Sequence, residues 1–474
     1  MGIIDALEPV YSLLPEVKPP EVPPSLKKRI MWSAAVLILF FILGRVWLVG
    51  MPAMDPNQYN QLIAFQELLA SETGTLLTAG IGPIVFASII LQLLVGAKVI
   101  DIDLTDPKGK ARFQGMQKLF TVGMCLFEGI IYPWSGMVPS SGLPNVLFLG
   151  LQIALGSMIL LYLDEVVGKY GIGSGIGLFI AGGVAQGFIW QIFRPPMLEG
   201  GALQPGLIFL FAQSVNLILL LPILIAILIF AIIVYTNAIH VNIPITMGRK
   251  GFGGRYPVSL LYVNVMPVIL AVALFANIRV WGALTASVPV LGDIMRWLIW
   301  ATGNPVTDAG WALQNTSIYN LFNRLIVDVG ASGFGILLTQ TLLWNILQGI
   351  IYLLLLCGTC VVFGKFWVKM GGQSSEDIAN QLESSGMYVP GFRRDSRIIE
   401  KILDRYIPPI VVIGSIFVGL LAGVGNMALG SVTGGQVASG TGILLTVGIV
   451  YKLYEQIARE QVKESSALLK KLFS

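Results

Sequence analysis

Cysteine, histidine and charged residues are all scarce in this chain. Three cysteines among 474 residues are too few for a disulfide framework, and a single histidine argues against a metal or proton-relay site built from histidines. Only 12% of the chain is charged while 55% is hydrophobic. A soluble domain usually carries about twice that charged fraction. A chain this apolar cannot cover itself with polar side chains, so part of its surface is expected to face lipid.

The motifs of ATP-driven and hydrolytic machines are also absent. No Walker-type GxxxxGK[ST] or HExxH sequence occurs, and no arrangement typical of an intramembrane protease is visible. The stretch GIGSGIG at 171–177 has the glycines of a nucleotide loop, but such a loop follows a strand, whereas this one opens an apolar run. We therefore expect no enzymatic activity, no cofactor and no metal.

Apolar runs long enough to cross a bilayer, roughly 18 residues or more, recur along the chain. They lie at about 30–50, 74–95, 113–135, 144–164, 172–193, 215–238, 258–281, 338–368, 406–428 and 440–458. A weaker candidate at 325–341 contains Asp328 and three glycines, so we interpret it as part of an external loop. The sequence thus predicts an all-α membrane protein with about ten transmembrane helices.

The positive charges predict an orientation for these helices. With the N-terminus in the cytosol, 25 of the 30 Lys and Arg residues fall on the cytosolic side. The five on the other side are Arg45, Arg194, Arg279, Arg296 and Arg324. Five runs lie in residues 1–200 and five in 201–474, and an odd number in each half makes the two halves enter the membrane in opposite directions. The topology is therefore that of an inverted repeat.

One segment between the first two runs is amphipathic and too short to span. In the helix predicted at about 58–70, Leu62, Phe65 and Leu69 share one face. An interfacial helix on the outer surface and a small plug folded into a cavity between helices both fit this spacing.

Two long loops predicted to be cytosolic, 239–257 and 365–405, are strongly basic. Positive charge beside a span can simply set topology or contact anionic headgroups. Arg393 and Arg394, however, lie far from both flanking spans. Arginine suits phosphate recognition, and RNA is the obvious cytosolic polyanion. A polyanionic partner is therefore the alternative to a pure topology signal.

Two polar residues lie at membrane depth. Glu128 stands in the third apolar run and Asn277 in the seventh. An intramembrane acid is by default functional and faces protein or water rather than lipid. A hydrogen-bonded structural role is the alternative for each.

Specific strings occur in order from the first span to the last: GIGPIV…QLLVG (80–96), FQG.QK (113–118), YLDEVVGKYGIGSGIGLFIA (162–181), PVILA.ALFANI (267–278), GFR (391–393), RYIPP (405–409) and GTGILLTV.IVY..YEQ (440–456). These strings resemble the SecY family of protein-translocation channels, most closely its archaeal branch. The external loop 282–340 matches least.

The resemblance implies a protein-conducting channel in which two five-helix halves surround a central pore with a side opening to lipid. Its constriction is a ring of apolar side chains, matched here by Ile81, Val85, Ile176, Ile180, Ile269 and Leu445. The pairs 81/85 and 176/180 are four residues apart, so each presents one helical face. Apolar rings exclude ions by dewetting.

Other roles follow from the same resemblance. The helix at 58–70 would be the plug, and Glu128 and Asn277 would lie near the side gate. Phe86 stands where related channels commonly have a hydroxyl residue at that gate. Arg249 and Arg393, with the neighbouring Arg394, match loop positions that dock the ribosome or another cytosolic motor.

The resemblance also implies partners and a location. The partners are a SecE-like and a small beta-type single-span subunit, the ribosome, signal peptides, nascent polypeptides and membrane lipid. The expected location is the plasma membrane of an archaeon, in preference to the endoplasmic reticulum. A secondary transporter is the main alternative, since inverted repeats occur there too. A transporter has little use for arginine-rich cytosolic loops, and an intramembrane enzyme would need a catalytic constellation.

Overall fold

A computed structural model describes most of residues 9–472. The residues outside the description are 1–8, 11, 23, 53–69, 97–98, 101, 103–106, 196, 200–201, 205, 215–220, 248–251, 286–287, 289, 304–334, 385–386, 389–395, 434–439 and 473–474. The predicted helix at 58–70, with Leu62, Phe65 and Leu69, and the arginines Arg249, Arg393 and Arg394 therefore lie outside the described residues.

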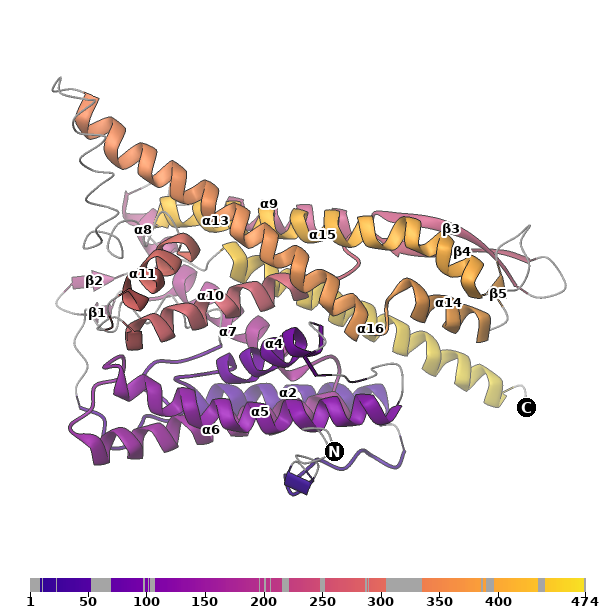
Figure 1. Ribbon diagram of the computed structural model, residues 1–474, viewed down its shortest axis with the longest axis horizontal. Helices are drawn as coiled ribbons and strands as arrows, with labels where there is room; N and C mark the ends of the chain where they lie inside the picture. The colour runs from indigo at the N-terminus through magenta and orange to yellow at the C-terminus, as the bar shows by residue number, and fades with distance from the viewer. Residues whose placement is uncertain are drawn as a thin grey trace.

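The N-terminal half is a bundle of antiparallel helices. Its helices are α2 (Leu26–Leu43), α4 (Gly82–Gly96), α5 (Pro107–Trp134), α6 (Leu143–Tyr170) and α7 (Gly175–Phe193), followed by the short strand β1 (Met197–Glu199). The helices α5 and α6 pack along much of their length, and α4 packs on α5. In Figure 1 α2, α4, α5 and α6 occupy the lower side of the molecule.

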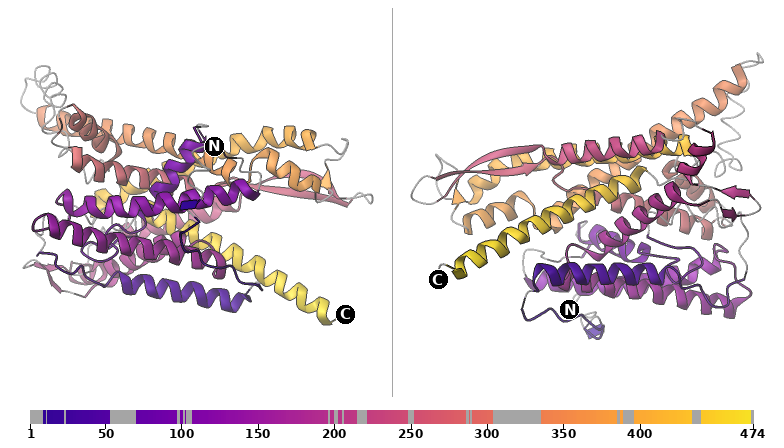
Figure 2. Two further views of the ribbon diagram at one scale, coloured as in Figure 1. Left: turned by 60° about the horizontal axis from the view of Figure 1, so that its bottom comes forward. Right: turned by 180° about the vertical axis from the view of Figure 1, so that it is seen from behind.

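The C-terminal half contains longer helices and most of the strands. Its elements are β2 (Ala202–Gln204), α8 (Leu207–Ser214), α9 (Leu221–Asn237), β3 (His240–Met247), β4 (Phe252–Ser259), α10 (Met266–Thr285), α11 (Leu291–Thr302), α13 (Gly335–Met370), α14 (Ser375–Ser384), β5 (Met387–Tyr388), α15 (Ser396–Thr433) and α16 (Gly440–Leu472). The two halves meet where α10 packs on α4 and α16 packs on α7 (Figures 1 and 2).

The helices confirm the predicted all-α class, and each predicted apolar run contains one. Among the described residues, four helices are long and apolar enough to cross a bilayer, within Leu143–Tyr170, Gly175–Phe193, Ile346–Ser384 and Arg397–Ala428. Shorter apolar helices occupy Gly82–Gly96, Ile223–Asn237 and Met266–Gly282. On α6, Leu147, Leu151 and Leu155 are exposed at four-residue spacing. Such an apolar stripe on the outside of the bundle is suited to lipid.

The second apolar run begins its helix later than predicted. The sequence places a span at 74–95, but α4 starts at Gly82 and residues 70–81 form turns. Threonine hydroxyls explain the difference, because they bond to nearby backbone instead of leaving it to a helix. Thr75 Oγ1 donates to the Glu72 carbonyl at 2.7 Å, and Thr78 Oγ1 accepts from the Gly74 N–H at 3.1 Å.

Two segments interpreted as loops contain regular structure. Most of the basic loop 239–257 is an antiparallel hairpin of β3 and β4, and β5 pairs with the far end of β3. Residues 335–341, interpreted as part of an external loop, form the first two turns of α13. That part of the run carries one of the three glycines, at Gly335, followed by ILLTQT, which favours a helix.

A tight corner joins α6 to α7. Ser174 caps α7 by accepting from the Gly177 N–H at 3.2 Å, and Asp164 accepts from the Ile176 N–H at 3.0 Å. The first N–H groups of a helix have no partner within it, so these two oxygens satisfy donors that burial would otherwise leave unpaired. A Cβ at Gly175 would lie 2.5 Å from the Asp164 Cα, so only glycine permits this approach.

We expect Asp164→Ala to lower the stability of the protein by about 1–2 kcal/mol, because the start of α7 loses a capping oxygen. The measurement is the thermal unfolding midpoint of purified protein in detergent. Asp164→Asn keeps one side-chain oxygen at the same position and serves as the control, with a smaller loss. An Ala variant as stable as the wild type would contradict the capping role.

Candidate functional site

Six apolar side chains from four helical segments meet in one hydrophobic cluster that includes both halves. Ile81, Val85, Ile180, Ile269 and Leu445 are buried members, and the partly buried Ile176 packs against them. These are the residues that the sequence places in a constriction. The cluster has many other members from both halves, so the role of these six residues as a pore ring stays a prediction.

Ile81 stands at the entrance to α4. The Val85 N–H donates to the Ile81 carbonyl at 3.1 Å, so the two residues are one helical turn apart, as their spacing predicts. The preceding turn is fixed by α6, because Ser157 Oγ donates to the Gly80 carbonyl at 3.1 Å. Gly156 allows α6 to come this close, since a Cβ there would lie 1.8 Å from the Leu76 carbonyl oxygen.

The three candidate gate residues lie on α4, α5 and α10, beside the contact between the halves. Phe86, Glu128 and Asn277 are all buried, with 5%, 1% and 2% of their surfaces exposed. Asn277 Nδ2 donates to the Ala273 carbonyl of its own helix at 3.0 Å. Glu128 Oε1 is buried and has no hydrogen-bond partner among the described residues. An unpartnered buried oxygen is costly, which favours a functional role for Glu128.

The two basic loops leave the same small sheet, although their arginines lie outside the described residues. Residues 248–251, which include Arg249, connect Met247 at the end of β3 to Phe252 at the start of β4. The strand β5 precedes residues 389–395 and pairs with the same end of β3, in the register Thr246↔Tyr388 and Met247↔Met387. The described flanks of the loops are therefore neighbours. Sequence reasoning did not predict this.

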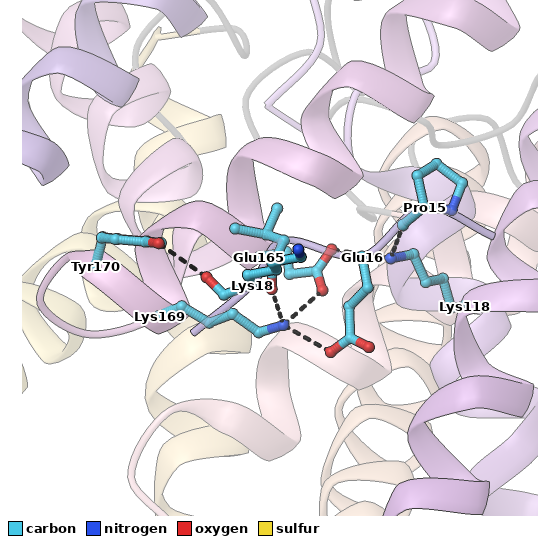
Figure 3. Close-up of polar contacts among 8 residues, drawn as sticks. Pro15, Glu16, Lys18, Lys118, Glu165, Lys169 and Tyr170 are labelled. Carbon is cyan, nitrogen blue, oxygen red and sulfur yellow. Dashed lines mark hydrogen bonds and ion pairs between the residues drawn. The ribbon is translucent and has the colours of Figure 1, made fainter. Parts of the chain in front are cut away.

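A polar network at the ends of α5 and α6 holds a segment that sequence reasoning missed (Figure 3). We call residues 15–18 the N-terminal strap. Glu165 accepts from Lys118 Nζ at 2.9 Å and from Lys169 Nζ at 3.0 Å. The side chains of Lys118 and Glu165 are only 15% and 19% exposed. One carboxylate thus positions two ammonium groups from α5 and α6 in a partly buried setting.

Both lysines reach on to the N-terminal strap. Lys118 Nζ donates to the Pro15 carbonyl at 2.5 Å, and Lys169 pairs with Glu16 at 2.7 Å and donates to the Val17 carbonyl. Tyr170 Oη donates to the Lys18 carbonyl at 2.8 Å. The strap is four residues long, begins with a proline and has no regular periodicity, so its docking could not be predicted. The available signal was the Glu165/Lys169 spacing of four residues, which places opposite charges on one helical face.

The fold defines a class of protein: a multi-spanning, all-α membrane protein whose two halves pack on each other through apolar side chains. The SecY family model matches residues 75–454. The protein translocase subunit SecY of Methanococcus vannielii is 40% identical, with 97% of each chain covered. This chain belongs to the SecY family, as its motifs predict.

Solved structures agree with this assignment. A structure described as that of a protein conducting channel has 36% identity and a TM-score of 0.77, covering 97% of this chain and 98% of the other. Sec61 in the canine ribosome–channel complex from the endoplasmic reticulum also has 36% identity, with a TM-score of 0.74 and the same coverage. The chain is thus a protein-conducting channel, and the secondary-transporter alternative finds no support in these relatives.

We expect Glu165→Gln to release the N-terminal strap, because both lysines lose the carboxylate that positions them. The stability should fall by about 2 kcal/mol, as a hydrogen bond to a charged group typically contributes. A glutamyl endopeptidase should cut after Glu16 faster than in the wild type, which is measured by the rate of appearance of the shortened chain.

The control for this change is Asp293→Asn, which removes the exposed pair of Asp293 with Arg296 on α11. An exposed pair contributes about 0–1 kcal/mol, so this variant should behave almost as the wild type. Equal rates of cleavage after Glu16 in wild type and Glu165→Gln would contradict the strap network.

Proposed function

We propose that this chain is the channel-forming subunit of a translocon. In this proposal an unfolded polypeptide crosses the membrane through the ring of Ile81, Val85, Ile176, Ile180, Ile269 and Leu445. Hydrophobic segments leave sideways into lipid between α4 and α10. The observation that supports the proposal is that five of these side chains are buried in one hydrophobic cluster, which contains residues of both halves, and that Ile176 packs against this cluster.

An apolar ring suits a pathway for many different sequences. Aliphatic side chains offer no fixed hydrogen-bond partner, so they favour no particular polar residue of the passing chain. A narrow apolar constriction also stays dewetted when it is empty, which blocks ions without a covalent or charged barrier. Ile81 and Val85 on one face of α4 and Ile180 on α7 supply such a surface from two sides.

The side exit is supported by the way in which α4 and α10 meet. They come from different halves, so a seam between them can open by moving one half against the other. Two buried polar residues lie on the helices of this region: Glu128, whose Oε1 has no partner among the described residues, and Asn277, whose side chain donates to the Ala273 carbonyl of its own helix. We propose that they contact an entering segment or its water.

A groove on the outside fits a single-span partner helix. Its lining is Ile30, Ser33, Ala34, Leu37, Ile172, Leu178, Leu453 and Ile457, from α2, α7, α16 and the turn before α7, and its volume is about 190 Å³. The side chains are almost all apolar, which suits a helix embedded in lipid. We propose a SecE-like subunit here. The proposal of a small beta-type subunit rests on the family resemblance.

The sheet of β3, β4 and β5 supports a docking role for the basic loops. Met247, which precedes residues 248–251 with Arg249, pairs with Met387 of β5, the strand that precedes residues 389–395 with Arg393 and Arg394. A relative occurs in a ribosome–channel complex. We propose that these arginines bind ribosomal phosphate, with the sheet on the cytosolic side, since arginine pairs with phosphate through two parallel hydrogen bonds.

The assignments of the plug, the two halves and the membrane belong to the same proposal. The segment 58–70 acts as the plug, on the strength of its amphipathic spacing, and residues 1–200 and 201–474 act as inverted halves. The membrane is the plasma membrane of an archaeon, because the SecY relatives with identities of 34–40% are mostly archaeal.

Replacing Val85, Ile180 and Ile269 together by Ser should make the resting channel leak ions, because a hydroxyl-lined constriction wets. The measurement is single-channel conductance in planar bilayers, with Leu147→Ser on the exposed face of α6 as control. A second readout is crosslinking, in which cysteines at 85 and 180 should join a stalled translocating chain. The ring assignment is wrong if neither leak nor crosslinks occur.

Arg393→Glu, and less strongly Arg249→Glu, should weaken ribosome binding, roughly tenfold at low salt for Arg393. The effect should shrink as salt rises, because the wild-type contact is itself screened. Co-sedimentation with ribosomes across a salt series measures it. The control is Arg459→Glu, which reverses another exposed charge, one that pairs with Glu455 on α16. Equal low-salt binding by wild type and the Arg249/Arg393 double reversal would mean that these arginines only set topology.

A further inference from the structure

Trp281 near the end of α10 makes ring contacts with two helices of the other half. Its ring meets Phe86 of α4 edge-on, with centroids 4.9 Å apart and planes at 77°. It also meets Phe127 of α5 edge-on, at 6.4 Å and 87°. Edge-to-face geometry is the favourable arrangement for aromatic pairs. One side chain of the C-terminal half is therefore held by two rings of the N-terminal half.

The neighbouring residue strengthens this attachment. Val280 is 2% exposed and lies in a cluster whose other buried members, such as Leu48, Ile131 and Leu149, all belong to residues 1–200. Trp281 packs against the same cluster. The end of α10 is thus inserted into the core of the opposite half, and these contacts must break when α10 moves away from α4.

The contacts that hold Trp281 are apolar. The indole Nε1 is buried and has no hydrogen-bond partner among the described residues, so ring packing rather than a polar bond fixes the side chain. Asn277, the candidate gate residue, lies one turn earlier on the same face of α10. Apolar packing has no directional partner, so an incoming hydrophobic segment can replace it.

We propose that Trp281 is a specificity-determining latch, whose contacts with Phe86 and Phe127 set how hydrophobic a segment must be to open the seam. The inference rests on the proposed lateral release between α4 and α10. A segment opens the seam when its own burial replaces the contacts that the latch loses. A stronger latch therefore demands a more hydrophobic segment.

The size of the effect follows from the two ring pairs. Loss of two edge-to-face contacts should raise the open fraction of the seam roughly tenfold or more. On the scale of insertion free energies, a tenfold change corresponds to about two to three leucines in a segment of otherwise neutral residues. The threshold for insertion should drop by that amount.

The test uses membrane vesicles that contain the full chain and a reporter with guest segments of increasing leucine content. Protease protection separates segments that cross from segments that enter the lipid. Trp281→Leu should lower the leucine number at half insertion, whereas Trp281→Phe keeps the ring edge and should stay close to the wild type. Phe86→Leu should shift the threshold in the same direction, and the double variant by less than the sum, because the residues share a contact.

The control is Phe40→Leu. Phe40 stacks on Phe179 at 5.0 Å within the N-terminal half, so its loss lowers the thermal unfolding midpoint without touching the seam. Its threshold should equal that of the wild type. A wild-type threshold in Trp281→Leu, equal shifts in the Phe and Leu variants, or additive shifts in the double variant would each overturn the latch. If the wild type itself inserted no reporter segment, the proposed lateral release would fail instead.

Discussion

A bilayer offers no hydrogen-bond partner to a backbone N–H or C=O group, and this constraint decides where the chain can depart from a helix. Between α2 and α4 the chain does depart, and side chains supply the partners. Gln152 bonds the N–H and the carbonyl of Val49 with its amide group, at 2.9 and 3.0 Å. Ser157 bonds the Gly80 carbonyl. The irregular segment that leads to Ile81 is therefore tied to α6.

The same constraint explains why apolar side chains occur both on the outer surface of the helical bundle and in its core. Outward-facing residues such as Leu151 meet lipid, while Ile81, Val85 and Ile180 face the interior cluster. A soluble protein would need only the interior set. The 55% hydrophobic content of the chain is the sum of these two demands, and for this reason composition alone indicated a membrane protein.

Local patterns predicted the helices well and tertiary contacts poorly. The four-residue spacing of Ile81 and Val85, and of Ile176 and Ile180, was sufficient to place each pair on one face. The start of α4 was wrong because threonine–backbone bonds compete with helix formation, and hydropathy does not register them. The N-terminal strap and the contact of Trp281 with Phe86 join residues far apart in sequence, so no periodicity reveals them. The pairing of β5 with β3 also joins residues far apart in sequence, so periodicity does not reveal it either.

Polar and apolar contacts have different places around the seam between α4 and α10, while an ion pair of Arg29 with Glu460, at 3.7 Å, joins α2 to α16 at another contact between the halves. Side-chain hydrogen bonds join elements inside each half: Gln117 to Ser88 at 2.7 Å in the first, and Asn426 to Tyr352 at 3.0 Å in the second. The seam between α4 and α10 is packed by rings and aliphatic side chains. Hydrogen bonds specify one geometry, whereas apolar packing accepts any partner of suitable shape. Each half can therefore move as a unit, and the surface exposed between them is one that a hydrophobic segment can cover.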